Sequence, residues 1–225
     1  MRETRRLAAR LRERARGRGA QAKLTAAHRL DELAERAEKV CRQILQRVAG
    51  EKITDRLVSF ADPDARPIRK GKLGKPNEFG YVAQIAEVTD HTKRGARGLI
   101  LPAACLPGNA HEDTLLPQTA AELTRLGLKV REVALDGGFT LAASTDSLSE
   151  LAPERVFISG RQQPGSRRTQ RRLQRYRTGA EGRISHLKRG YGLRRSRLKG
   201  HDGQKTTTGW GILAYNLDTL AIRTS

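Results

Sequence analysis

The strongest constraint on what this chain can fold into is the uneven distribution of its charge. Its 225 residues include 44 Lys and Arg against 24 Asp and Glu, which gives a formal net charge of +20. The excess is concentrated in residues 161–205, where fifteen Lys or Arg accompany only two acids, Glu181 and Asp202. Like charges at this density repel one another in a compact monomer, so the region favours a polyanionic partner, and nucleic acid is the first candidate.

The remaining composition limits the setting of the protein. Cys41 and Cys105 lie far apart, with neither metal-ligand nor paired spacing, which predicts a reduced cytoplasmic location. The N-terminus has charges but no apolar core of the signal-peptide kind, and no apolar run approaches the about 18 residues of a membrane span. Aromatic residues make up only 4% of the chain, which argues against a base-stacking binder of single strands.

The N-terminal part, residues 1–53, is predicted to be a basic helical segment. An Arg-rich stretch is compatible with a helix until Gly17 and Gly19 interrupt it, and a second helix is predicted over about 21–48. Apolar residues recur there at spacings of three and four: Leu30, Leu33, Ala37, Val40, Ile44 and Val48. We interpret this stripe as a packing face within the chain; the alternative is a dimer seam, for which the run is short.

Residues 54–225 are predicted to form an α/β domain. Strands are expected at 79–88 and 98–105, as antiparallel neighbours, and at 129–135 and 155–158. Helices are expected at 113–126, despite Pro117, and at 169–189, with a loop at 199–208 after the second. The last segment is predicted to be a helix whose core face carries four apolar residues: Trp210, Leu213, Leu217 and Leu220.

Two carboxylates stand at positions suited to metal chemistry. Asp136 closes a predicted strand and precedes two glycines, so it can reach a crevice at the strand's C-terminal end, although an ordinary Asp-Gly turn explains it as well. On the predicted basic helix, Arg177, Glu181 and Lys188 are spaced by four and seven residues and therefore share one face. The simpler interpretation is a surface Arg177–Glu181 pair contributing about 0.3–0.5 kcal/mol; the functional one is a metal-binding acid between cations that contact phosphate.

The same residues resemble a known family. The spacing of Arg177, Glu181 and Lys188, with three residues and then six between them, is similar to the signature around the last acid of DDE insertion-sequence transposases. The runs GAEGRISHLKRGYGLRRSRLKG (179–200) and GWGILAYNLDTLA (209–221) resemble their C-terminus, and LDGGF (135–139) resembles the strand with their second Asp. GKPNEFGYVAQIAEV (74–88) and PGNAHED (107–113) resemble the hairpin and turn between their first two acids. The resemblance covers roughly residues 55–221.

The resemblance implies a fold, a chemistry and partners. The fold is an RNase H-like mixed sheet flanked by helices, after the N-terminal helical segment. The activity is cleavage and transfer of DNA strands at transposon ends, with Mg²⁺ (or Mn²⁺) held by Asp136 and Glu181. The partners are double-stranded DNA and further copies of the chain, in the nucleoid. Ten basic residues are expected to contact phosphates: Arg171, Arg172, Arg175, Arg177, Arg183, Lys188, Arg189, Arg194, Arg195 and Lys199.

The chain departs from the family at two points. Gln174 stands where the signature has Tyr, and the first Asp is not evident. The nearest upstream acids, Asp62 and Asp64 in the sequence FADPDARP, are interpreted first as a turn that leads into the hairpin. Asp64 is the substitute that we assign to catalysis as the alternative. We expect an N-terminally truncated copy that lacks the first core strand and has weak or no strand transfer alone. The alternatives are a catalytically dead DNA-binding remnant that regulates an intact transposase, and a basic RNA-binding or ribosome-associated protein.

Overall fold

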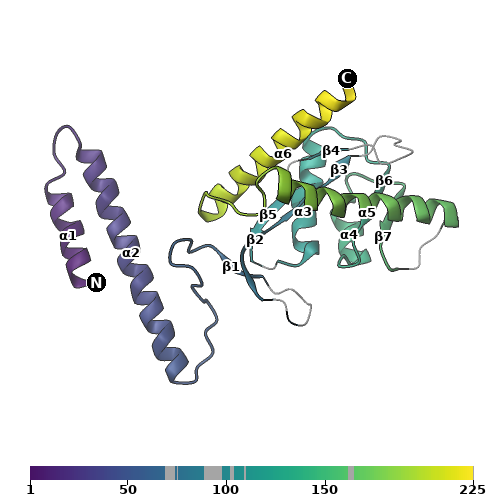
Figure 1. Ribbon diagram of the computed structural model, residues 1–225. Coiled ribbons are helices and arrows are strands. Elements are labelled where there is room, and N and C mark those ends of the chain that lie inside the picture. The colour runs from purple at the N-terminus through teal and green to yellow at the C-terminus, as the bar shows by residue number, and fades with distance from the viewer. Residues whose placement is uncertain are drawn as a thin grey trace. The chain divides into compact units, whose positions relative to one another are not determined.

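The computed structural model describes residues 1–68, 74, 76–88, 98–101, 104–108, 110–161 and 165–224 (Figure 1). The chain is divided into two compact units, Met1–Arg66 and Pro67–Ser225. The division falls at Arg66/Pro67 and not at the predicted residue 53, because the segment after the second helix folds back onto that helix.

The first unit is a hairpin of two antiparallel helices, α1 (Arg2–Glu13) and α2 (Ala20–Val48). Their contact is lined by alanines, since Ala8, Ala27 and Ala34 are buried. These small side chains let the two backbones approach closely. The predicted packing stripe on α2 is wrong for three of its members, since Leu33, Ile44 and Val48 are exposed. The other three are partly buried: Leu30, Ala37 and Val40.

Residues 54–66 belong to this unit through contacts with α2. Leu57 is buried, and its backbone pairs with the amide of Gln43, which donates to the Leu57 carbonyl at 3.2 Å and accepts from the Leu57 N–H at 2.5 Å. Lys39 and Asp55 form an ion pair that, with Arg66, holds the pKa of the Asp55 carboxyl below its usual value. Together with Arg36, whose Nη1 donates to the Phe60 carbonyl at 3.4 Å, these contacts tie the segment to α2.

The second unit combines helices and short strands, as the α/β prediction requires. Its strands are β1 (Arg66–Ile68, which begins at the boundary), β2 (Glu78–Gln84), β3 (Glu87–Val88), β4 (Leu99–Ile100), β5 (Ala104–Pro107), β6 (Glu132–Leu135) and β7 (Arg155–Ile158). Its helices are α3 (Glu112–Arg125), α4 (Leu141–Ser147), α5 (Arg167–Gly190) and α6 (Gly200–Thr224).

The predicted antiparallel pair of strands is present but broken in the middle of each strand. β2 pairs with β5 and β3 pairs with β4, both antiparallel, while β6 and β7 run parallel from Glu132–Arg155 to Leu135–Ile158. In the part of the chain that the structure describes, the strands form three small sheets and not the one mixed sheet that was predicted. The predicted α/β class is confirmed in the sense that the unit combines helices with small parallel and antiparallel sheets.

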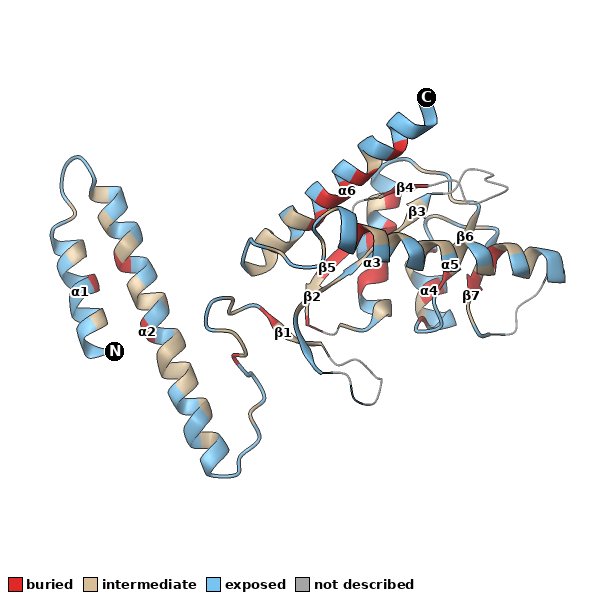
Figure 2. Ribbon diagram, in the orientation of Figure 1, coloured by how far each residue is buried: buried red, intermediate tan, exposed pale blue. Residues whose placement is uncertain are grey.

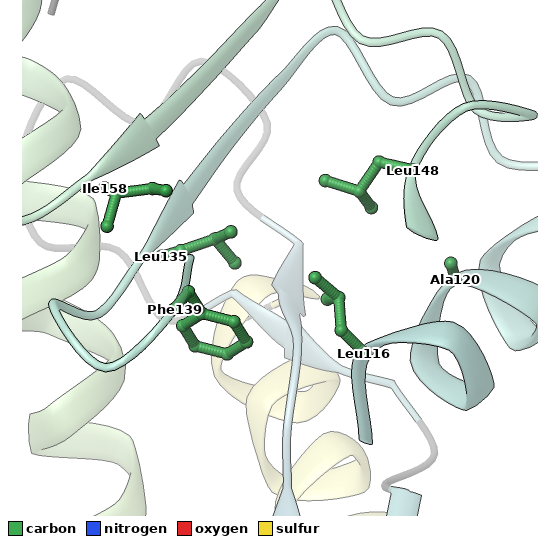
Figure 3. Close-up of a cluster of buried hydrophobic side chains, with 6 residues drawn as sticks. All are labelled: Leu116, Ala120, Leu135, Phe139, Leu148 and Ile158. Atoms are coloured by element: carbon green, nitrogen blue, oxygen red, sulfur yellow. The ribbon is translucent and has the colours of Figure 1, made fainter. Parts of the chain in front are cut away.

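The core beneath the β6–β7 sheet is an apolar cluster contributed by α3, α4 and the two strands. Helix α3 continues through Pro117, its sixth residue, although a proline has no N–H to donate to the carbonyl four residues earlier, that of Asp113. Figure 3 shows the members converging on one another: Leu116, Ala120, Leu135, Phe139, Leu148 and Ile158. Leu135 and Phe139 flank the Asp136-Gly137-Gly138 turn, so the core fixes that turn from both sides.

Two predictions about the C-terminal part of the chain, the loop over 199–208 and the core face of the last helix, are wrong. Helix α6 begins at Gly200, so the expected loop over 199–208 is helical. Its buried face carries Ile212 and Tyr215, which pack with Ile100 and Leu187, and Figure 2 shows that the opposite side is exposed. The four apolar residues predicted to face the core are all exposed: Trp210, Leu213, Leu217 and Leu220.

A polar contact explains why this face of α6 is the buried one. The Asn216 side chain accepts from the Ile100 N–H at 2.8 Å and donates to the Ile100 carbonyl at 2.7 Å. It therefore pairs with both backbone groups of β4, as a neighbouring strand would. The Tyr215 hydroxyl donates to the Gly98 carbonyl at 3.3 Å and holds the same strand.

We therefore expect opposite outcomes for the two largest aromatic residues of α6. Tyr215 is 0% exposed, so Tyr215→Ala should destabilise the protein by about 3–5 kcal/mol. Trp210 is 68% exposed, so Trp210→Ala should change the free energy of unfolding by within about 0.5 kcal/mol. Urea unfolding of the two variants checks this, and a larger loss for Trp210→Ala would contradict the orientation of α6.

Candidate active site

Asp136 is held at the C-terminal end of β6, in the tight turn that follows the strand. Its Oδ1 accepts a hydrogen bond from the N–H of Gly137 at 2.6 Å. Buried Leu135 and Phe139 anchor the turn on either side, while the Asp136 side chain is about half exposed. An acid at the end of a parallel strand thus faces outward from a fixed backbone.

Glu181 comes to the same place from α5. Ser166 caps the start of this helix, its hydroxyl accepting from the Thr169 N–H, and the helix packs against β6 and β7 with Leu173 buried. Gln174, at the position where the family has Tyr, contacts the Ser159 hydroxyl just after β7 at 3.1 Å. This packing turns one face of α5 toward the end of β6.

Arg177 joins the two acids. Its Nη2 donates to Asp136 Oδ1 at 2.8 Å and to Glu181 Oε1 at 2.6 Å, and its side chain is 20% exposed. Because both oxygens bond to one nitrogen, they lie no farther apart than the two bond lengths together. The structure therefore brings together the two carboxylates that the sequence predicts, 45 positions apart. The Arg177–Glu181 helix pair is also present, so the simpler interpretation describes part of the same arrangement.

A third carboxylate, which the sequence analysis missed, lies beside this pair. Glu112 opens α3, and its Oε2 is buried without a hydrogen-bond partner. A Cβ placed on Gly138 would lie 2.2 Å from this oxygen, so the carboxylate sits directly against the turn that carries Asp136. Burial, followed by the nearby charge of Asp136, raises the pKa of Glu112 above its usual value.

Two polar contacts fix the start of α3 against the rest of the site. Asp113 accepts from the Thr140 N–H at 3.0 Å and from the Thr140 hydroxyl at 2.8 Å, which ties α3 to the loop after Asp136. Gln84 of β2 donates to the Glu112 carbonyl at 3.1 Å. The position of Glu112 beside the Asp136 turn could not be predicted from the sequence, because acids are common in the first turn of a helix, where they interact favourably with the helix dipole.

Three of the ten cations expected to contact phosphates lie in ion pairs within the chain. Arg172 binds Glu132 at 2.5 Å, Arg177 binds both acids of the site, and Arg183 binds Glu87 at 2.9 Å. These guanidinium groups therefore hold α5 on the sheets, and their assignment as phosphate contacts stays a prediction that requires them to leave these pairs. The other seven are exposed: Arg171, Arg175, Lys188, Arg189, Arg194, Arg195 and Lys199.

Asp64 lies in an exposed turn of the first unit, whereas Glu112, Asp136 and Glu181 belong to the second. Its assignment to catalysis stays a prediction.

Comparison with family models, with curated proteins and with solved structures finds no match for this chain. Among the residues that the structure describes, no helix is both long and apolar enough to cross a membrane. Within the same residues no group of three or more His, Cys, Asp or Glu side chains has the arrangement of a metal site. At the Asp136–Glu181 pair, the positively charged group that lies between the two carboxylates is the guanidinium of Arg177.

Proposed function

We propose that this chain is a DNA-binding protein of the transposase type, with an RNase H-like catalytic domain that cleaves and transfers DNA strands at transposon ends. The single observation that carries the proposal is the convergence of Asp136 and Glu181 on one cationic nitrogen. The acids come from the end of a parallel strand and from a strongly basic helix. Double-stranded DNA is the proposed substrate, and the protein would act as a homo-oligomer on it.

The donor set suits a hard divalent cation. Asp136 and Glu181 offer carboxylate oxygens that already turn toward a positive charge, and Glu112 offers a buried oxygen without a partner. Asp136 and Glu181 would hold Mg²⁺ or Mn²⁺. When bound, such an ion would act as a Lewis acid toward the phosphodiester. The bound ion would take the place of Arg177 beside the two acids. Arg177 would then be available to a DNA phosphate on the face of α5 that it shares with Lys188.

The experiment is an end-cleavage assay. Purified protein is incubated with duplex DNA that ends in the inverted repeat of the flanking element, with and without Mg²⁺ or Mn²⁺. Metal-dependent cleavage that leaves a free 3′ hydroxyl supports the proposal. Tight binding without cleavage favours the second candidate, a catalytically dead regulator, because Arg177 already pairs with both acids.

DNA binding should depend steeply on salt. Each phosphate contact contributes a slope of about −0.9 in log K against log salt, so Arg194→Ala with Arg195→Ala should flatten the slope by about 1.8. The matched control removes two exposed cations elsewhere, Arg125 and Arg131, each of which pairs with a nearby acid. Fluorescence anisotropy between 50 and 200 mM salt, the range over which such slopes are read, measures both. An unchanged slope in the first variant would contradict the proposed surface.

A further inference from the structure

One side of helix α2 is covered by neither of its neighbours in the first unit. Helix α1 packs on the side that carries Ala27 and Ala34, which are both buried. The segment after the helix packs on a second side, where Gln43 bonds to the backbone of Leu57. At 3.6 residues per turn, a third side lies between these two and carries four apolar residues: Leu33, Ala37, Val40 and Ile44. We call this side, together with Leu30, the α2 stripe.

The first unit has few large apolar side chains in its interior. Within Met1–Arg66, all of which the structure describes, the buried apolar residues are four alanines and Leu57. Leu33 and Ile44 of the α2 stripe are exposed instead. Because burial of methyl groups alone contributes little hydrophobic stabilisation, a unit of this size is marginally stable without further burial. The unit therefore gains stability from a partner that covers the stripe.

The α2 stripe has the spacing of a coiled-coil seam. Its five apolar residues recur at alternating spacings of three and four: Leu30, Leu33, Ala37, Val40 and Ile44. No charged residue interrupts this register until Arg47, which stands in the last turn of α2, where a long side chain can reach solvent. Such a seam fits a second helix with the same apolar spacing, and another copy of α2 supplies one.

Charge on the two flanks of the stripe favours one orientation of two α2 helices. One flank is basic and carries Arg29 and Arg36, whereas the other is uncharged and carries Ala34 and Cys41. Parallel helices place the basic flank of one copy against the uncharged flank of the other, and antiparallel helices place like flanks together. Antiparallel pairing would therefore bring arginines of both copies side by side, which parallel pairing avoids.

We propose that two copies of this chain associate through a parallel pair of α2 helices, joined along the α2 stripe. Leu33, Val40 and Ile44 of each copy would contact their counterparts in the other. The inference goes beyond the proposed function: that function names a homo-oligomer, whereas the α2 stripe gives the surface that joins its copies. This contact involves neither DNA nor a metal.

The first test is the oligomeric state of the full chain without DNA, measured by sedimentation equilibrium. The unmodified protein should form a dimer, and Ile44→Asp should raise its dissociation constant at least about 10-fold, because each copy then places an unpaired charge in the seam. Ile44 is 57% exposed within the chain, so the substitution should leave the circular dichroism spectrum unchanged. The comparison variant is Leu45→Asp, at a neighbouring position that is 69% exposed and outside the stripe; its dimer should be as stable as that of the unmodified protein.

Disulfide formation tests the parallel orientation. In a parallel pair the two copies of residue 37 face each other, and a disulfide needs their Cα atoms about 4.4–6.8 Å apart. Ala37→Cys, combined with Cys41→Ser, should therefore give a linked dimer on oxidation, since the remaining cysteine, Cys105, is buried. Arg42→Cys in the same background lies on the opposite side of α2 and should stay unlinked. An antiparallel pair would instead place residue 37 against Val40.

The outcomes separate this inference from the proposed function. A monomer without DNA, or a dimer that Ile44→Asp leaves intact, overturns the seam, and the proposed function is then still judged by the cleavage assay. A dimer that Ile44→Asp breaks but that Ala37→Cys fails to link overturns the parallel orientation. A protein that forms this dimer but neither binds nor cleaves DNA overturns the proposed function and leaves the seam in place.

Discussion

Asp136→Asn and Glu181→Gln are each expected to lower metal-dependent cleavage of DNA ends by at least about 100-fold. Supporting residues around a metal typically cost 10–100-fold when removed, so loss of a direct ligand should reach at least the upper end, about 100-fold. Both substitutions preserve side-chain shape and remove one negative charge. Single-turnover rates with Mn²⁺, measured alongside DNA affinity, separate the loss of chemistry from a loss of binding.

The control for this prediction is Asp64→Asn. Asp64 lies in an exposed turn of the first unit, and its interpretation as a turn residue predicts that its substitution leaves the cleavage rate unchanged. A loss comparable to that of Asp136→Asn would instead support Asp64 as the first acid of the triad. Cleavage that survives Glu181→Gln would rule out the site assignment.

Glu87→Ala and Arg183→Ala should each destabilise the second unit by about 3–5 kcal/mol, because each leaves a buried charge without its partner. The Glu87 side chain is 6% exposed and that of Arg183 is 18% exposed, and their atoms meet at 2.9 Å. Glu87 also accepts the Gly98 N–H at 2.9 Å. The pair therefore joins α5 to the β3–β4 sheet and fixes both within the unit.

Denaturant unfolding of the two single variants and the double variant measures this coupling. The double variant should lose less than the sum of the singles, because no unpaired charge remains. Glu122→Ala breaks an exposed pair and should cost no more than about 1 kcal/mol. Losses below that level for both Glu87 and Arg183 would contradict the burial of the pair.

The sequence predicts well those parts of the fold that depend on local patterns. Helix α3 with its early proline, helix α5 and strand β7 lie within a few residues of their predicted ranges, because capping residues and apolar periodicity act over short distances. The meeting of Asp136 and Glu181 was also predictable, since each stands at a recognisable place in its element and the family resemblance links them.

The sequence does not predict which face of an amphipathic helix is buried when two faces compete. On α6 the exposed stripe with Trp210 and the buried stripe with Tyr215 have the same spacing, and the choice depends on Asn216 pairing with β4, 116 positions away. Glu112 was missed for a related reason. Its position against the Asp136 turn depends on the space at Gly138, which only the folded chain creates.

The most direct test of the central claim, that one divalent ion binds between β6 and α5, is iron-directed cleavage of the protein itself. Fe²⁺ replaces Mg²⁺, and peroxide with ascorbate then generates radicals that cut the backbone near the bound ion. The account predicts fragments that end near Asp136 and near Glu181, suppressed by excess Mg²⁺ and lost in Asp136→Asn. Cuts elsewhere in the chain, or the same cuts in Asp136→Asn, would contradict it.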